Sequence, residues 1–97
     1  MVMAAHVGLA FVGLALPATS SLKEKRAIIR SGVAHVRHKF NVSISEVGAL
    51  NTYRRAELAI AAVTNCKPVT EALLQDAIRL LEGDPRVTLE DIHVEFL

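Results

Sequence analysis

Four cationic side chains recur at helical spacing in one segment of the chain. They are Lys23, Arg26, Arg30 and Arg37, and at 100° per residue they share an arc of about 60°. A row of such groups can bind the phosphates of a nucleic acid backbone, which supplies affinity without reading bases. The same pattern is typical of a solvated helix face whose aliphatic stems cover the edge of the core. Both interpretations stay open at this point.

Further cations extend this candidate surface. One lies in the same helix, and a Tyr-Arg-Arg sequence that could stack on a base or cap a sheet end lies in a later loop. The predicted nucleic-acid-binding residues are therefore Lys23, Lys25, Arg26, Arg30, Arg37, Tyr53, Arg54 and Arg55. Residues 1–55 carry eight Lys or Arg and two acids, whereas residues 56–97 carry three and eight. This asymmetry fits a basic binding face, or oppositely charged surfaces that meet in an oligomer.

The remaining chemically active residues form no catalytic or metal-binding pattern. His35 and His38 share a helix face but have no third ligand at helical spacing. His6 and His93 lie in strands predicted to be neighbours, and could form a hydrogen-bonded pair. Cys66 is the only cysteine, which excludes an internal disulfide and a zinc ribbon and indicates a reducing, cytoplasmic compartment. We predict a non-enzymatic protein without metal or cofactor.

Known loops that bind phosphate for catalysis are also missing. The chain has neither a P-loop nor a G-x-S-x-G turn. The predicted loop at residues 17–21 lacks the arginine and the glycine-rich cradle of an acylphosphatase-like enzyme. With one Tyr, three Phe and no Trp, the sequence also lacks the aromatic platform with which an RRM sheet binds RNA.

Two helices are predicted from apolar residues at helical spacing. The first begins at Ser21, whose spacing to Glu24 matches a capping box, and stops near Asn41. Its apolar stripe is Leu22, Ile29, Val33, Val36 and Phe40. The second begins at Pro68 and is capped by Gly83. Its predicted stripe is Val69, Leu73, Ala77, Leu80 and Leu81, widened by Leu74 and Ile78.

Four strands complete the predicted order β-α-β-β-α-β. They cover residues 2–16, 42–47, 55–65 and 87–97, with a bulge near Asp91. This is the α+β ferredoxin-like arrangement, a four-stranded antiparallel sheet with two helices on one face, in a single domain over residues 1–97. The apolar first and third strands should be central and the polar second and fourth strands should lie at the edges. Small residues such as Ala59 and Ala61 should line the open face, where a second copy could bind.

The first 16 residues form an uncharged run that only His6 interrupts. A signal peptide is an alternative interpretation, but no Lys or Arg precedes the apolar run. The run is also shorter than the roughly 20 residues that span a membrane. We therefore predict a buried strand and no association with a membrane.

Three segments resemble the YlxP-like bacterial family, a domain of unknown function. They are KEKR at 23–26, FNVSISEV at 40–47 and RAEL at 55–58. Tyr53 stands where the family usually has an aromatic residue, often Trp. The resemblance covers nearly the whole chain and implies a ferredoxin-like fold. The family's genes tend to lie near those of transcription and translation factors, which implies an RNA or ribosome connection by association only.

Overall fold

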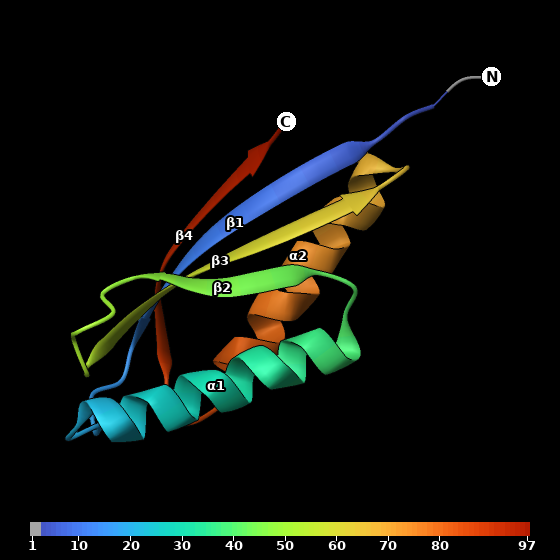
Figure 1. Cartoon of the computed structure of the whole chain (residues 1–97). Coiled ribbons are helices and arrows are strands. Elements are labelled where there is room, and N and C mark those ends of the chain that lie inside the picture. The colour runs from blue at the N-terminus through green and yellow to red at the C-terminus, as the bar shows by residue number, and fades with distance from the viewer. Residues whose placement is uncertain (1–2) are drawn as a thin grey trace.

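Two long apolar strands form the centre of the sheet. The computed structural model describes residues 3–97. Its elements are, in order, β1 (His6–Ala15), α1 (Leu22–Lys39), β2 (Ser43–Gly48), β3 (Arg55–Thr64), α2 (Lys67–Glu82) and β4 (Thr88–Phe96). The strand order is β2-β3-β1-β4 with every pair antiparallel, and both helices lie on one side of the sheet (Figure 1). The predicted ferredoxin-like fold is confirmed, with β1 and β3 central.

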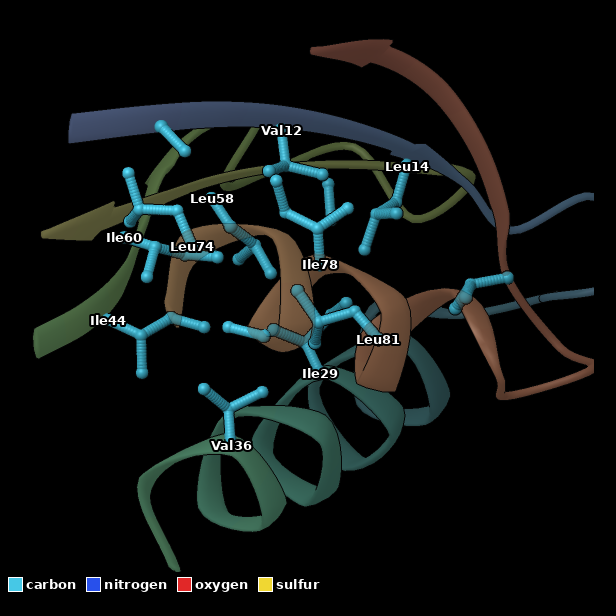
Figure 2. Close-up of a cluster of buried hydrophobic side chains, with 14 of the residues drawn as sticks. Val12, Leu14, Ile29, Val36, Ile44, Leu58, Ile60, Leu74, Ile78 and Leu81 are labelled. Carbon is cyan, nitrogen blue, oxygen red and sulfur yellow. The ribbon is translucent and has the colours of Figure 1, made fainter. Parts of the chain in front are cut away.

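The core lies between the sheet and the helices. Alternate residues of β1 and β3, such as Val12, Leu58 and Ile60, point to the helical side and are buried. They meet Leu74 of α2, while Val36 of α1 closes the far side of the cluster (Figure 2). The period-2 pattern of the strands and the helical stripes therefore converge in one apolar layer.

The buried face of α2 differs from the predicted stripe. Leu74 and Ile78 lie at its centre, whereas Val69 is 49% exposed. Leu73 and Leu80 are half-buried. Ala77 and Leu81 are buried as predicted, together with the two residues that widened the stripe. The buried face is therefore rotated from the predicted centre towards Leu74 and Ile78, because apolar residues cover about half of this helix and spacing alone does not choose among them.

The ends of both helices are capped largely as predicted. Ser21 Oγ accepts from the Glu24 N–H at 3.1 Å, and the Glu24 carboxylate accepts from the Ser20 hydroxyl, also at 3.1 Å, rather than from Ser21. At the other end, α1 stops before Phe40, whose extended backbone donates to the carbonyl of Val36. The predicted stop at Asn41 was thus one residue late. Gly83 caps α2 in a right-handed conformation.

Two bulges adjust the edge strands. In β4 the pairing shifts between Gly13 and Leu14, so Glu90 is the extra residue, next to the predicted position at Asp91. In β2 the shift lies between Glu46 and Gly48 and leaves Val47 unpaired. Leu89 before the bulge and Ile92 after it are three residues apart, which in a regular strand would place them on opposite faces. The extra residue puts both on the same face of the sheet, opposite Leu14 and Val12.

A short turn joins α2 to β4. The Arg86 guanidinium donates to both carboxylate oxygens of Asp84 at 3.0 and 2.7 Å. These hydrogen bonds lower the pKa of Asp84 below its ordinary value. Over residues 3–97, neither helix is long and apolar enough to cross a membrane.

Candidate functional site

The exposed shoulder of α1 carries the four cations that helical spacing grouped together. Lys23, Arg26, Arg30 and Arg37 are all exposed, and we call these four residues the basic ridge. Among the described residues, none of the four forms an ion pair with an acid. At 1.5 Å per residue the basic ridge extends over about 21 Å. It is therefore a row of exposed cations without acidic partners among the described residues.

Arg37 also holds the edge of the sheet. Its Nη2 donates to the carbonyl oxygen of Ile44 in β2 at 2.8 Å. Because β2 is an edge strand, this bond occupies a backbone acceptor that no neighbouring strand uses. The contact also places the basic ridge alongside β2.

Lys25 lies inside the protein, contrary to the prediction that it contributes to the binding surface. Its side chain is fully buried, with Nζ 2.8 Å from Glu46 Oε2 and 2.7 Å from the carbonyl oxygen of Ala49. Glu46 Oε2 is itself buried and has no other hydrogen-bond partner among the described residues. The ion pair joins α1 to β2 and to the loop that follows it, so this charge is not available to a ligand.

Arg55 is also unavailable, because acids surround it on the open face of the sheet. Its guanidinium lies 2.7 Å from Glu90, 2.8 Å from Asp91 and 3.4 Å from Glu57. The hydrogen bond to Asp91, followed by that to Glu57, raises the pKa of Arg55 above its ordinary value. A Cβ at Gly13 would lie 2.7 Å from Arg55 Nη2, so the guanidinium crosses β1 where there is no side chain. The predicted phosphate contact by Arg55 is replaced by this cluster.

Tyr53 and Arg54 form a cation–π contact in the loop between β2 and β3, and we call this pair the Tyr53–Arg54 stack. The Arg54 guanidinium carbon lies 5.6 Å from the centre of the Tyr53 ring. Arg54 Nε donates to the carbonyl of Thr19 at 3.3 Å, and the Arg54 carbonyl accepts from the Leu16 N–H at 2.9 Å. The stack is therefore attached to the segment that leads into α1, and Tyr53 remains 39% exposed.

The face of the sheet opposite the helices is apolar at its centre. As predicted, Ala59 and Ala61 lie on it, beside Phe11 and Leu9 of β1 respectively. Phe11 is 40% exposed. It borders a depression of about 230 Å³ that extends from β2 to β4. We call this surface the open face.

A protein-family model described as "Protein of unknown function (DUF503)" matches residues 7–94. The chain belongs to the DUF503 family. It is also 42% identical over 67 residues to "Uncharacterized protein YlxP" of Bacillus subtilis (strain 168), a match that covers 69% of this chain and 73% of the relative. Both findings confirm the resemblance noted in the sequence, and neither description states an activity.

The histidines of this DUF503 chain do not converge. His93 stacks on Phe11 with ring centres 6.3 Å apart and contacts Glu95 at 2.9 Å, whereas His6 pairs with Thr64 in β3. The strands that carry His6 and His93 are neighbours, as predicted, but the two side chains do not pair, because His93 lies opposite Phe11 and β4 pairs with β1 only from Gly8 onward. Across residues 3–97, no group of three His, Cys, Asp or Glu side chains is placed to hold a metal ion.

In this DUF503 chain, the sequence did not predict the residues that hold Lys25 and Arg54 in place. Lys25 is four residues from Ile29, which places both on the buried face of α1, and this spacing was the available signal. No comparable signal points to Glu46, Ala49 or Thr19, because their contacts depend on how the loops meet in space. The structure thus reduces eight predicted binding residues to the basic ridge and the Tyr53–Arg54 stack.

Proposed function

We propose that the protein is a small non-enzymatic module that binds RNA through the basic ridge, as an RNA- or ribosome-associated accessory factor. The observation that carries this proposal is the absence of acidic partners along the basic ridge within residues 3–97. Off the basic ridge, Lys25, Arg55, Arg79 and Arg86 each pair with an acid. The other three described cations, Lys39, Arg54 and Lys67, form no ion pair, but they do not stand in a row along one helix face. Uncompensated, exposed cations in a row are the footprint of a polyanion.

The geometry favours contact with the phosphate backbone. Arg and Lys side chains along one helix shoulder can neutralise successive phosphates, and they carry no donor pattern specific for a base. The sheet offers no RRM-type platform, because the open face presents Phe11 and His93 beside an acidic cluster. Binding through α1 should therefore depend strongly on salt and weakly on sequence.

The variant Lys23→Gln/Arg26→Gln/Arg30→Gln tests this proposal. Arg37 is left intact because it also holds the β2 edge. Removing three phosphate contacts is expected to reduce the slope of log affinity against log salt by about 2 for single-stranded RNA. At low salt the affinity should fall at least about tenfold. Fluorescence anisotropy with labelled RNA over a salt series measures both quantities.

The matched control is Lys67→Gln/Arg79→Gln/Arg86→Gln. It removes the same number of charges from residues outside the basic ridge, and all three side chains are exposed. This variant should keep the wild-type slope. Equal losses in the two variants would mean that net charge, rather than the basic ridge, governs binding, and would refute the proposal.

A second candidate function is self-association through the open face, which we propose as a dimer interface. Phe11 and Leu9 stand beside Ala59 and Ala61, so large side chains of one copy can fill the hollows over the small residues of another. Within residues 3–97, Arg55 is the one Lys or Arg on this face, and acids already neutralise it, which disfavours a nucleic acid here. A second copy of the chain is therefore the occupant that we propose.

Sedimentation equilibrium over a wide range of protein concentration tests the dimer. The expected result is a mass that approaches twice that of the chain in the wild type and that of a monomer in Phe11→Ser. Val69→Ser is the control, because Val69 is similarly exposed but lies on α2. A wild-type protein that stays monomeric at the highest concentration would exclude this interface.

A further inference from the structure

We infer that Tyr53 and Arg54 form a stacking site for a nucleobase next to the first turn of α1, and that the preferred ligand is single-stranded RNA. This inference rests on the proposed function, because the basic ridge supplies the backbone contacts. It adds base stacking to the phosphate contacts and specifies that the RNA is single-stranded. An unpaired base has a free π-face, whereas bases within a duplex already stack on each other.

The Tyr53–Arg54 stack is preorganised. Arg54 reaches back over the Tyr53 ring, and its Nε donates to the Thr19 carbonyl two residues before the Ser21 cap of α1. This bond fixes the guanidinium plane, while the ring remains 39% exposed. Aromatic rings and guanidinium planes are the groups on which proteins stack unpaired bases. Little side-chain entropy would be lost when a base adds to a stack that already exists.

The loop beneath the stack is held by the same helix that carries the basic ridge. The Ala49 carbonyl accepts from the Thr52 N–H at 3.0 Å and from Lys25 Nζ at 2.7 Å. Ala49 adopts a φ of 55°, the one positive value outside glycine among the described residues. The buried ammonium thus stabilises a strained turn directly before Tyr53 and ties the backbone of that turn to α1. One helix therefore positions both the phosphate contacts and the aromatic ring.

Intrinsic tyrosine fluorescence reports on the Tyr53 ring and on no other residue. Tyr53 is the only tyrosine and the chain has no tryptophan, so tyrosine emission reports one ring. The probes are oligouridylate, a base-free ribose phosphate oligomer of equal length, and an RNA duplex. We expect oligouridylate to quench the emission strongly and the other two to leave it nearly unchanged. N-acetyltyrosinamide titrated in parallel corrects for absorption by the RNA.

Affinities measured by anisotropy separate stacking from charge. Oligouridylate should bind about tenfold more tightly than the base-free oligomer, because one stacked base contributes that much. Tyr53→Leu should remove this advantage and leave binding of the base-free oligomer unchanged. Tyr53→Phe should keep it, since the ring remains. The Lys23→Gln/Arg26→Gln/Arg30→Gln variant should weaken the binding of both oligomers.

The outcomes separate this inference from the function on which it rests. Equal binding of the two oligomers without quenching, together with full affinity in Tyr53→Leu, would overturn the stacking site and leave RNA binding by the basic ridge intact. Absence of binding by any probe at low salt would overturn both. If the base-free oligomer and the duplex quench the tyrosine emission as strongly as oligouridylate does, the ring responds to charge and not to a stacked base. That result would also refute stacking.

Discussion

Replacing Lys25 with methionine is expected to lower the free energy of unfolding by about 3 kcal/mol. Methionine fills much of the lysine volume, so the cost arises mainly from the groups left behind. The Glu46 carboxylate, which is 20% exposed, would lose its partner, and the Ala49 carbonyl would lose a charged donor. Breaking a buried ion pair on one side costs about 3–5 kcal/mol. Because Glu46 is partly exposed, water can solvate its carboxylate, and we expect a cost at the lower end of this range.

Urea denaturation followed by circular dichroism measures the change. Lys23→Met, on the exposed side of the same helix, is the control and should stay within about 0.5 kcal/mol of the wild type. The double variant Lys25→Met/Glu46→Leu should recover most of the loss, since an apolar pair can replace a buried ion pair at little cost. Similar stabilities for Lys25→Met and Lys23→Met would show that water compensates Glu46, contrary to the structure.

Replacing Leu74 with alanine is expected to cost about 3 kcal/mol. Leu74 is 1% exposed and lies where α2 crosses the central strands (Figure 2). The loss combines reduced transfer of apolar surface from water with a cavity that the stiff sheet cannot close. Leu73→Ala is the neighbouring control, because Leu73 is only half-buried and its loss should be clearly smaller.

Gly8 provides a second test of the same contact. A Cβ at Gly8 would lie 2.7 Å from Leu74 Cδ1, so Gly8→Ala alone should destabilise the fold by about 1–2 kcal/mol. In Gly8→Ala/Leu74→Ala the clash with Leu74 disappears, although Thr70 Cγ2 and Phe96 Cε1 remain at 3.0 and 3.1 Å, and the new methyl group occupies part of the cavity. The double variant should therefore cost clearly less than the sum of the single variants in thermal or urea unfolding. Strict additivity would contradict the packing of Gly8 against Leu74.

The sequence was sufficient for most of the fold because the relevant signals are local. The apolar runs of β1 and β3 predict central strands, since a strand with neighbours at both edges is shielded more than an edge strand. The phase change around Asp91 predicts the bulge, and Ser21 with Glu24 predicts the start of α1. Each of these signals lies within a few residues and does not depend on the rest of the chain.

The site was less predictable because the availability of a charge depends on distant partners. Helical spacing grouped Lys23 and Arg26 correctly, but it gives no information about the carboxylate that lies opposite Lys25. Arg55 was assigned to phosphate binding because it follows Tyr53 and Arg54 in the loop. Strand alternation instead turns Arg55 onto the open face, where the bulged β4 supplies two acids.

The position of β1 between β3 and β4 also affects the order in which the sheet can assemble. Neither neighbour of β1 is close in sequence: His6 pairs with Thr64 and Gly8 with Phe96. Pairings between such distant residues slow folding, because loop-closure entropy is lost before the contacts form. During synthesis, one edge of this apolar strand stays without a partner until β4 has left the ribosome. The segment most prone to non-native pairing is thus the one that completes its hydrogen bonds last.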